Sequence, residues 1–449
     1  MVSITNPFHS LLLKSHQRKE RRPPKIDMSR VATIILGGGE GKRLFPLTQH
    51  RCKPAISFGG RYRLIDIPLS NSINSGCHKI FIITQFLSSS LNQHIFRTYR
   101  HDIFNSGFLE LLPAEQKPTK KGWFEGTADA VRQNLDYFYE IPVDYFFVLS
   151  GDQLYTMNYQ EMLRVALETN SDAVIAALPI SDEDSKRMGV LQINNDGIVT
   201  DFIEKPQDLI LVEKMRLPSN LKIKNVSNKK NHSLLGSMGI YLFKREALFK
   251  LLEEDPREDF GKHLLPTLIK KGNTAAYLFD EYWEDIGTID SFYKANMALT
   301  EADPEFNSYD EINPIFTTRY NLPGAKIYNT VVKNSLICEG CIVEADEITH
   351  SILGPRTTVK KGSIIRDSYL MGSDFYTPPI QTNRLPENLQ VGENCLIIKT
   401  ICDKNVCIGN RVQLTNKMNL THYDGDNIYI RDGIIVIPRG VNIPDGFIL

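Results

Sequence analysis

The chain has 449 residues, which is too many for one ordinary hydrophobic core and favours two domains. Its 42% hydrophobic and 23% charged residues are typical of a soluble globular protein. The formal net charge of -1 gives no overall field that would attract nucleic acid, and no apolar run approaches the ~20 residues of a membrane span. We therefore expect neither a nucleic-acid partner nor a membrane partner.

A basic segment, residues 1–30, opens the chain. Its lysines and arginines cluster between Lys14 and Lys25, and Pro23 and Pro24 interrupt any helix there. A plastid transit peptide is also basic and poor in acids, but this segment lacks the serine-rich character of such peptides. We therefore predict a disordered arm on a bacterial cytoplasmic protein. The seven scattered cysteines suit a reducing cytosol.

A short buried strand and a glycine-rich turn come next. The apolar run Val31 to Leu36 predicts the strand. Glycine lets the backbone approach a ligand closely, and successive free N–H groups in such a turn can bind an anion. Lys42 and Arg43 follow at once and Lys53 lies a little further on, so the stretch suits a polyphosphate. Its spacing matches neither the Walker A loop nor the dinucleotide fingerprint, and a plain turn after a core strand is the alternative. The glycines are Gly37, Gly38, Gly39 and Gly41.

Strand and helix patterns then alternate as far as about residue 296. This alternation predicts an open, mostly parallel β-sheet with helices on both faces, in an α/β domain of residues 31–296. Ligands of such sheets bind beyond the carboxyl ends of the strands, where the glycine turn and a corner at Asp152 both fall. The predicted strands are Lys79–Thr84, Tyr145–Leu149 and Asp172–Ala177, and the predicted helices are Ser88–Tyr99 and Tyr159–Thr169.

The pattern changes after a proline-containing stretch, residues 297–325, which we interpret as a linker. In residues 326–449, apolar or small residues recur at every sixth position. This period predicts a parallel β-helix, in which each turn stacks on the last, and a small antiparallel barrel would not produce it. The proline-rich segment 373–393 should loop out of the solenoid. The recurring positions are Ile337 and Val343; Leu353, Val359, Ile365 and Met371; and Leu396, Cys402, Ile408 and Leu414.

Several strings resemble the signature motifs of the ADP-glucose pyrophosphorylases, a family of sugar-nucleotide nucleotidyltransferases. The first string runs from Gly37 to Gly76 and reads GGGEGKRLFPLTQHRCKPAISFGGRYRLIDIPLSNSINSG. The resemblance continues through WFEGTADAVRQNL, LSGDQLY, FIEKP, SMGIYLF and YWEDIGTIDSFYKAN, and covers almost everything after residue 30. It implies a Rossmann-like nucleotidyltransferase domain followed by a left-handed parallel β-helix, assembled as a homotetramer. It also implies adenylyl transfer from ATP to α-D-glucose 1-phosphate for glycogen or starch synthesis.

Two acids in these motifs are candidates for a metal site. Asp152 lies in LSGDQLY and Asp285 in YWEDIG. On its own, a Gly-Asp pair after a strand is more often a turn than a metal site. Hard Mg²⁺ prefers a few carboxylates plus phosphate oxygens, so two aspartates from distant segments suit it. The resemblance implies that these two hold the catalytic Mg²⁺. We expect Arg43 and Lys53 to cover the leaving pyrophosphate and the α-phosphoryl group.

The nucleotide contacts are expected from the glycine turn and from three residues beyond it. The resemblance implies that Gln85, at the end of the KIFIITQ strand, reads the edge of the base, although a lone glutamine there usually has no such role. Gly126 and Thr127 are candidates for contacts on the adenine side. Three acids within the matched motifs receive structural or nucleotide-positioning roles. They are Asp66, Glu125 and Asp129.

The sugar-phosphate contacts are expected around FIEKP. We expect Pro206 to hold Lys205 in an extended conformation. The Lys205 cation then suits the phosphate, and the Glu204 carboxylate suits the sugar hydroxyls. A neighbouring Glu-Lys pair is ordinarily solvated, but the resemblance implies this binding role. Phe124 stands where bacterial relatives often carry tyrosine, and so it lacks the hydroxyl for a sugar contact. The resemblance adds two further contacts, Gly189 and Ser237.

The resemblance also implies regulation by an anionic metabolite. Where enteric bacterial enzymes carry an activator-binding lysine, this chain has His50, a poor phosphate anchor when neutral, while the neighbouring Arg51 offers a bidentate fork. Lys404 and Arg439 stand where plant-type enzymes place lysines that bind a phosphorylated three-carbon acid. We predict that a sugar-phosphate or phosphoglycerate activator binds between Arg51 and these two cations, and that fructose 1,6-bisphosphate is the weaker ligand. Ordinary surface cations are the alternative.

Two other functions of the same architecture stay open. A pyrophosphorylase for UDP-, dTDP- or GDP-sugars shares the glycine turn and the β-helix. A non-catalytic regulatory subunit keeps the fold with a degraded site, but this chain retains the residues of an intact one. Those residues are Arg43, Lys53, Asp152, Lys205 and Asp285.

A β-helix acyltransferase and a zinc site are disfavoured. The acyltransferase needs a catalytic histidine in the coils, where only His350 and His422 lie, without an evident partner. The CxxC formed by Cys338 and Cys341 has no second pair at zinc spacing, and we interpret both cysteines as packing residues.

Overall fold

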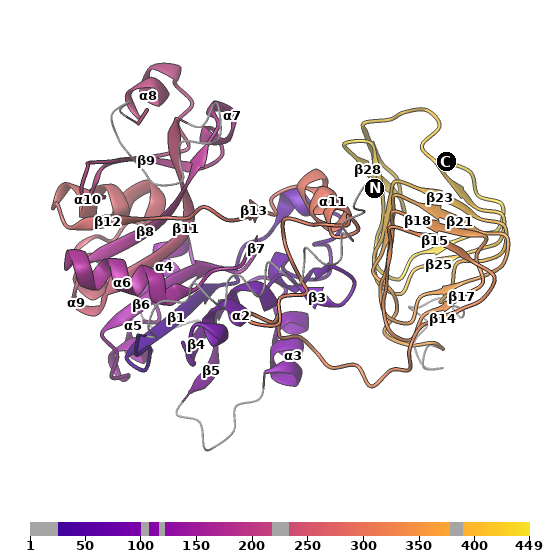
Figure 1. The fold of residues 1–449 in the computed structure, drawn as a ribbon, viewed down its shortest axis with the longest axis horizontal. Coiled ribbons are helices and arrows are strands. Elements are labelled where there is room, and N and C mark those ends of the chain that lie inside the picture. Colours follow the sequence, from indigo (N-terminus) through magenta and orange to yellow (C-terminus); the bar gives the residue numbers. More distant parts are fainter. Residues whose placement is uncertain (1–25, 100–106, 116–121, 218–232, 378–388) are drawn as a thin grey trace, which may run out of the picture.

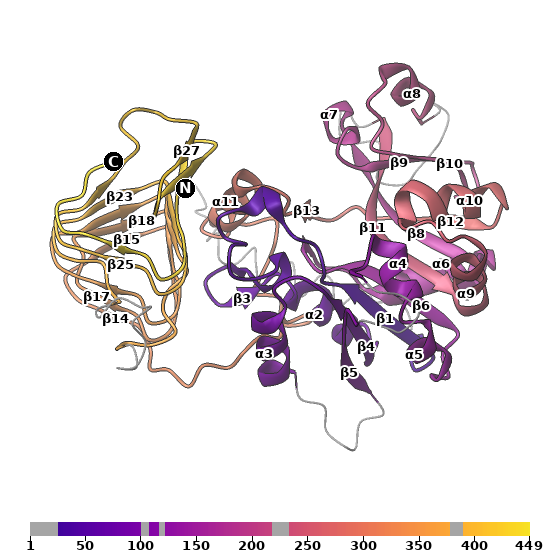
Figure 2. The same cartoon turned by 180° about the vertical axis from the view of Figure 1, so that it is seen from behind.

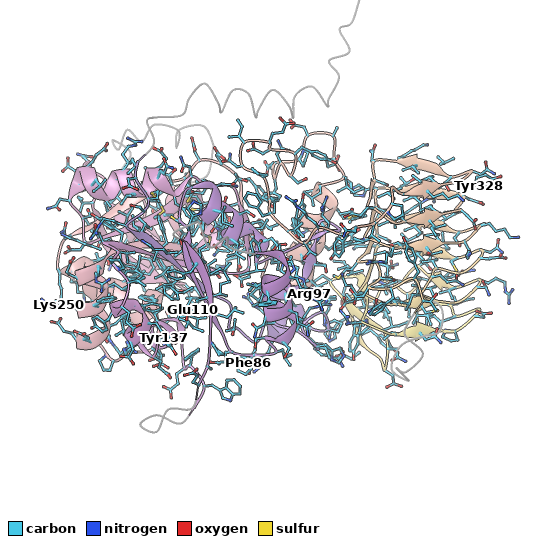
Figure 3. The ribbon with its side chains drawn as sticks, turned by 90° about the horizontal axis from the view of Figure 1, so that it is seen from below. Phe86, Arg97, Glu110, Tyr137, Lys250 and Tyr328 are labelled. Carbon is cyan, nitrogen blue, oxygen red and sulfur yellow. The ribbon has the colours of Figure 1, made fainter. Side chains whose placement is uncertain are left out.

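The computed structural model describes residues 26–99, 107–115, 122–217, 233–377 and 389–449. An α/β domain occupies one side of the molecule and a stack of β-strand coils the other (Figures 1 and 2). Seen from below, the two lie side by side, with Tyr328 on the side of the coils that faces away from the α/β domain (Figure 3). The predicted basic arm lies almost wholly outside the described residues.

The predicted parallel strands form the middle of the sheet in the α/β domain. β1 (Val31–Leu36) lies between β4 (Lys79–Thr84) and β6 (Tyr145–Ser150), and β5 (Phe108–Pro113) lies beyond β4. All three pairings are parallel, and the predicted bounds of β1 and β4 are confirmed. Leu36 lies opposite Ser150, so the glycine turn and the Asp152 corner leave the same edge of the sheet.

The sheet becomes antiparallel at β11 (Leu234–Lys244). This strand pairs with β9 (Gly189–Ile193) in its first half and with β6 in its second half, and it also pairs with β8 (Ala173–Ile180). β10 (Val199–Glu204) extends the sheet beyond β9, and β12 (Thr274–Leu278) runs parallel to β8. Strand direction was beyond prediction here, because buried strands of both directions have similar apolar patterns.

Helices cover both faces of the sheet, as predicted (Figure 1). Neighbouring residues of β1 divide between two hydrophobic cores: Ile35 packs with α2, α3 and α6, and Ile34 packs with α4, α5 and α9. The predicted helix Tyr159–Thr169 is confirmed as α6; it begins at an Asn158 cap and ends at Asn170, whose φ of 49° stops the helix. The helices are α2 (Asp66–Asn74), α3 (Ser89–Thr98), α4 (Thr127–Arg132), α5 (Leu135–Tyr139), α6, α7 (Asp182–Ser185), α8 (Leu209–Lys214), α9 (Arg245–Glu254), α10 (Leu265–Lys270) and α11 (Ile289–Ala298).

None of the helices within the described ranges has both the length and the apolar character that crossing a membrane requires.

Parallel ladders build the C-terminal coils. In one of them, Lys326 of β14 (Lys326–Ile327) pairs with Ile342 of β17 (Ile342–Val343), which pairs with Thr358 of β20 (Thr358–Val359). The coil therefore takes 16 residues here, and it takes 17 where Glu347 pairs with Ile364. A strict period of six over three sides would need roughly 18. A second ladder contains β15 (Val331–Lys333), β18 (Glu347–Thr349), β21 (Ile364–Arg366), β23 (Leu396–Ile398) and β26 (Gln413–Leu414). A third contains β16 (Leu336–Ile337), β19 (Ile352–Leu353), β22 (Tyr369–Leu370), β24 (Thr400–Cys402) and β29 (Ile434–Ile437). A short parallel pair joins β25 (Cys407–Ile408) and β30 (Asn442–Ile443).

Two details of the predicted solenoid are wrong. Leu370 packs inside the coils, whereas Met371 packs in the core shared with the α/β domain. The coil takes 17 residues here and not 18, so the inward position comes one residue earlier in the chain, at Leu370. The segment predicted to loop out also ends before residue 393, because Val391 bridges to Val359 and to Ile408 within a ladder. Residues 378–388 of that segment lie outside the described residues.

A continuous hydrophobic core joins the two halves of the molecule. The cluster that contains Phe292 of α11 also contains Tyr369 and Val436 of the coils, and the rings of Phe292 and Tyr369 lie 6.0 Å apart. Residues 299–325, all of them described, connect α11 to β14 without a helix or strand. They are held on the α/β domain, where the Phe316 N–H donates to Ser70 Oγ at 2.8 Å.

Candidate active site

The glycine turn continues from β1 as a tight backbone loop. The Gly37 N–H donates to the Ile83 carbonyl at 2.8 Å. Gly41 has a φ of 65°, and a Cβ at this position would lie 2.9 Å from Thr48 Cγ2, so both conformation and space require glycine. A Cβ on Gly39 would meet nothing within 4 Å. The turn therefore borders open space at the carboxyl edge of the sheet, where a ligand can approach its backbone.

Two short strands bring the predicted acids together. β7 (Gln153–Tyr155) begins one residue after Asp152 and pairs antiparallel with β13 (Trp283–Asp285), which places Asp285 opposite Gln153. Lys53 Nζ lies 2.6 Å from Asp152 Oδ2 and 3.5 Å from Asp285 Oδ1. One ammonium group thus lies between two carboxylates that come from distant parts of the chain.

The charges of this group stabilise one another. Burial raises the pKa of Asp152, but the Lys53 ammonium and the Ser150 hydroxyl outweigh this effect. The pKa of Asp152 therefore lies below its ordinary value of 3.8. Burial lowers the pKa of Lys53, but Asp152 and Asp285 outweigh this effect and raise the pKa above its ordinary value of 10.5. Asp152 and Lys53 are therefore both charged at neutral pH.

The two carboxylates fit a Mg²⁺ ion that takes its other ligands from a substrate. They accept one cation in this structure, since Lys53 Nζ lies against both. The described ranges contain no group of three or more Asp, Glu, His or Cys residues arranged to hold a metal, so the protein would supply only two ligands here. Mg²⁺ is commonly bound by one or two carboxylates together with phosphate oxygens and water. Asp152 and Asp285 are thus the candidate ligands.

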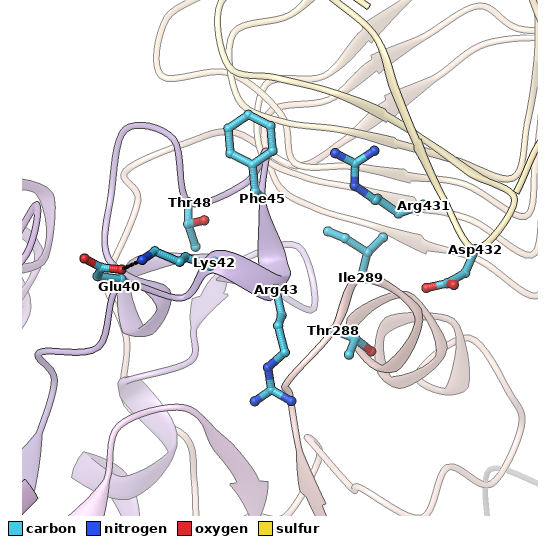
Figure 4. A pocket seen from close by; sticks show the side chains of 9 residues that line it. All are labelled: Glu40, Lys42, Arg43, Phe45, Thr48, Thr288, Ile289, Arg431 and Asp432. Atoms are coloured by element: carbon cyan, nitrogen blue, oxygen red, sulfur yellow. Dashed lines mark ion pairs between the residues drawn. The ribbon is translucent and has the colours of Figure 1, made fainter. Parts of the chain in front are cut away.

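Arg43 lies next to the acid pair. A Cβ on Gly287 would lie 3.1 Å from Asp285 Oδ2 and 3.3 Å from Arg43 Nη2, so this glycine leaves room for both groups. Beside Arg43 is a cavity of about 720 Å³ whose walls include Lys42, Thr288 and Arg431 (Figure 4). Arg431 belongs to β28 (Tyr429–Arg431) of the coils, so the cavity is bordered by both halves of the molecule.

The residues predicted on the nucleotide side hold neighbouring loops in place. Gln85 Oε1 accepts from the Phe124 N–H at 2.6 Å, and Gln85 Nε2 donates to the Phe124 carbonyl at 3.4 Å. Thr127 Oγ1 donates to Asp259 Oδ2 at 3.2 Å and accepts from the Phe260 N–H at 3.1 Å. The Gln85 amide keeps one N–H and one lone pair beyond these bonds.

Gly126 and the three acids assigned to supporting roles contact neighbouring segments of the chain. A Cβ on Gly126 would lie 2.4 Å from the Glu258 carbonyl oxygen. Asp129 Oδ2 accepts from the Glu125 N–H at 3.1 Å. Asp66 is fully buried, and its carboxylate contacts His94 at 2.5 Å, Tyr99 at 2.7 Å and Thr317 at 2.7 Å. Asp66 therefore ties the connecting segment to α2 and α3.

Most of the predicted sugar-phosphate residues lie where β10 ends, where β9 begins and within β11. These residues are Glu204 and Lys205, Gly189 and Ser237. Lys205 Nζ lies 3.1 Å from Glu204 Oε1. A Cβ on Gly189 would lie 2.8 Å from Glu204 Oε2, so glycine leaves space for that carboxylate. Ser237 is 7% exposed and its Oγ accepts from the Gly239 N–H at 3.3 Å.

The expectation of an extended Lys205 is wrong. Its φ is 46°, in the left-handed region, and its N–H donates to the Met188 carbonyl at 3.1 Å. Its own carbonyl accepts from Gln207 Nε2 at 3.0 Å. These two bonds hold a conformation that the following proline alone would disfavour. The Lys205 side chain is nonetheless more than half exposed, so it is accessible to a ligand.

The three predicted effector cations lie at the junction of the two halves, but each already has an acidic partner. Arg51 is 5% exposed and pairs with Asp403. Asp374 pairs with Lys404 at 3.2 Å and with Arg439 at 2.5 Å. Lys404 is only 6% exposed, so the alternative that it is an ordinary surface cation is wrong. The Arg439 side chain is the most accessible of the three.

The remaining sequence candidates have local partners. His350 Nδ1 contacts Asp367 Oδ1 at 2.6 Å and His422 Nε2 contacts Asp424 Oδ2 at 3.2 Å, so the prediction that they lack partners is wrong. Cys338 and Cys341 are free thiols. Sequence reasoning missed Gln153 and its neighbour Trp283; the only available signal was their position inside LSGDQLY and YWEDIG.

Two family models match the chain. Residues 32–302, more than half of its length, match the model described as nucleotidyl transferase. Residues 319–448 match the model described as the GLGC left-handed parallel beta-helix domain. Together they account for both halves of the molecule, and they confirm the predicted fold class, including the left-handed β-helix.

Proposed function

The chain belongs to the nucleotidyl transferase family, and we propose that it transfers the adenylyl group of ATP to α-D-glucose 1-phosphate. The products would be ADP-glucose and pyrophosphate, in the committed step of glycogen or starch synthesis. The observation that carries this proposal is the convergence of Asp152, Asp285 and Lys53 beside the open glycine turn. The GLGC-type coils support the choice of ADP-glucose among the sugar nucleotides.

The reaction needs no covalent enzyme intermediate. A phosphate oxygen of glucose 1-phosphate attacks the α-phosphorus of ATP, and the bond to the leaving pyrophosphate breaks in line with the attack. The attacking oxygen is already anionic, so no general base is required. The protein has to hold two anions in register and neutralise the charge that accumulates on the phosphoryl oxygens.

Different residues of the described structure would bind the two substrates and the metal. The glycine turn would bind the triphosphate through its backbone, and Arg43 and Lys53 would cover the pyrophosphate and the α-phosphoryl group. Asp152 and Asp285 would hold Mg²⁺, which neutralises phosphate oxygens when bound. On the sugar side, Lys205 would bind the phosphate. Glu204 and Ser237 would accept hydrogen bonds from sugar hydroxyls.

The Gln85 amide supports adenine as the base. It retains one N–H and one lone pair after its bonds to Phe124. Either of these groups could bond one polar atom on the edge of adenine, the N–H to a ring nitrogen or the lone pair to the amino group. Gly126 and Thr127 lie at the start of α4, shortly after Phe124, and would border the base.

A nucleotide-specificity assay tests the proposal. The purified chain is supplied with Mg²⁺, glucose 1-phosphate and, in separate reactions, ATP, UTP, dTTP or GTP. We expect sugar nucleotide from ATP at least ~10-fold faster than from the others, because a single pair of correctly placed hydrogen bonds discriminates bases by about 1–3 kcal/mol. Preference for another nucleotide would favour a pyrophosphorylase for a different sugar nucleotide. No turnover with any of the four would favour a non-catalytic regulatory subunit.

A further inference from the structure

The backbone of β11 changes partners beside the candidate sugar-phosphate site. Its pairing with β9 ends at Gly236 and its pairing with β6 begins at Tyr241. The register against β8 also shifts between Ser237 and Tyr241. The intervening residues thus leave the ladders, and their backbone polar groups need other partners because they are buried. Gly239, with a φ of 69°, forms the bend.

Gln153 supplies one of those partners. Its Nε2 donates to the Met238 carbonyl at 2.7 Å, and its Oε1 accepts from Trp283 Nε1 at 3.4 Å. Gln153 is 7% exposed, and it is the residue opposite Asp285 in the β7–β13 pair. One amide therefore joins three segments. These segments carry Asp152, Asp285 and Ser237.

The contacts explain why an uncharged amide suits this position. A carboxylate could accept from Trp283 but would face the Met238 carbonyl oxygen without a proton to donate, and it would add negative charge beside two aspartates. An apolar side chain of the same length would leave the Met238 carbonyl unpaired in a buried place. Only a side chain that donates and accepts satisfies both neighbours.

We propose that Gln153 is a positioning residue that couples the carboxylate pair to the Ser237–Gly239 bend, so that the metal side and the sugar-phosphate side of the site share one geometry. This inference rests on the proposed function. The bond to Met238 fixes the bend next to Ser237, and the bond to Trp283 fixes β13 two residues before Asp285. Loss of the amide should therefore impair both sides together, while the triphosphate side, built on β1 and β4, is largely spared.

The test compares Gln153→Met with a matched control, Gln160→Met. The Gln160 side chain likewise donates one bond and accepts another, to the Ser75 carbonyl at 3.0 Å and from the Ile26 N–H at 3.2 Å, but it lies on α6 away from the site. For Gln153→Met we expect KM for glucose 1-phosphate and the half-saturating Mg²⁺ concentration to rise together by about 10-fold, the order that two lost hydrogen bonds produce. KM for ATP, measured at saturating Mg²⁺, should change by less than about 2-fold. The Gln160→Met control should leave all three constants unchanged.

A binding measurement without catalysis completes the test. Calorimetric titration with glucose 1-phosphate alone should give about 10-fold weaker binding for Gln153→Met and unchanged binding for the control. Trp283→Phe, which removes the indole N–H donor together with part of the ring and keeps the Met238 bond, should shift both constants in the same direction by a smaller factor. Equal shifts in the ATP and sugar-phosphate constants, or wild-type binding by Gln153→Met, would refute the coupling while leaving the proposed reaction intact. If the wild-type protein neither binds glucose 1-phosphate nor forms ADP-glucose, the proposed function itself is wrong.

Discussion

The lysine between the two aspartates is central at the scale of single residues. Lys53 neutralises Asp152 and Asp285, and its own charge is stabilised by them. The same ammonium would lie within reach of a phosphate bound beside the acid pair, so it suits both an empty site and a loaded one. The charged side chains of this site are already paired with one another before a substrate binds. This pairing lowers the free-energy cost of keeping them in fixed positions.

Removing the charge of Asp152 should disable the chemistry and spare the fold. Asp152→Asn keeps the shape and loses the ligand charge, so we expect kcat to fall by at least ~10²–10³-fold, the usual effect of one preorganised electrostatic group. Steady-state kinetics at saturating Mg²⁺ measures this. Asp290→Asn, at an exposed carboxylate on α11 paired with Lys294 at 2.7 Å, is the control and should stay within about 2-fold of wild type. Near-normal turnover of Asp152→Asn would exclude the metal-ligand role.

Substrate binding should depend on Lys205 in a selective way. Lys205→Gln removes a charged contact of about 1.5–3 kcal/mol, which corresponds to a rise of roughly 10- to 100-fold in KM for glucose 1-phosphate. KM for ATP should hardly move, because we propose that the triphosphate binds at the glycine turn. The neighbouring exposed lysine, Lys186, provides the control variant Lys186→Gln. An equal increase in both Michaelis constants would mean that Lys205 acts through the fold.

The contribution of sequence at this scale was uneven. The resemblance to the family predicted the acid pair through LSGDQLY and YWEDIG, and the structure brings both aspartates to Lys53. The left-handed conformation of Lys205 was beyond prediction, since it depends on bonds to Met188 and Gln207 that form only in the folded chain. Gln153 was missed for the same reason: its partners lie 85 and 130 residues away.

At the scale of elements, the local sequence pattern predicted the bounds of the regular helices and strands. β1, β4 and α6 have the predicted bounds, because each is a regular apolar or amphipathic run with clear ends. The direction of β11 and the position of Leu370 were not predictable, since they are decided by pairing partners and by a coil length of 17 rather than a multiple of six. Tertiary pairing thus decided the details that periodicity left open.

One ion cluster should make the stability of the coils depend on pH. Burial raises the pKa of Asp374, but Lys404 and Arg439 outweigh it, so the pKa lies well below its ordinary value of 3.8. A lowered folded-state pKa contributes stability that is fully present above the unfolded pKa and is lost as the pH falls through the folded pKa. We therefore expect Asp374→Asn to reduce the free energy of unfolding by about 1–3 kcal/mol at pH 7 and by progressively less below pH ~4. Thermal unfolding at several pH values measures this.

An ion pair with a single, exposed cation provides the comparison for Asp374. Glu347 pairs with Arg366 at 2.7 Å on the outer surface of the same coils. Glu347→Gln should cost less than about 1 kcal/mol at pH 7, because solvent screens such pairs. If Asp374→Asn costs no more than Glu347→Gln, or if its cost is the same at pH 3 and pH 7, the ion cluster of Asp374 does not stabilise the junction.

For the whole molecule, the shared core predicts that neither half is independent. The α/β domain buries Phe292 and Leu47 in the same cluster as Tyr369, Ile401 and Val436 of the coils. Ending the chain before Leu336 would expose this apolar surface, and we expect the truncated protein to aggregate or to lose its assembly. Light scattering measures both. The full chain should be a homotetramer, and a stable, active full-length monomer at micromolar concentration would contradict this expectation.

The last prediction concerns regulation through the junction of the two halves. Arg51, Lys404 and Arg439 lie there with Asp403 and Asp374 as partners, so an anionic activator would have to compete with these carboxylates. Arg439 is the most accessible of the three cations and makes no contact with the acid pair of the site. We therefore expect Arg439→Ala to weaken activation by 3-phosphoglycerate about 10-fold without changing activity in its absence, the size of effect expected for one charged hydrogen bond. Arg366→Ala, which removes an exposed coil arginine, is the control and should leave the activation curve unchanged. Fructose 1,6-bisphosphate should activate at higher concentrations than 3-phosphoglycerate, because His50 is a weaker phosphate anchor than a lysine at that position would be. The hypothesis is wrong if fructose 1,6-bisphosphate is the stronger activator, or if Arg439→Ala leaves both activation curves where they were.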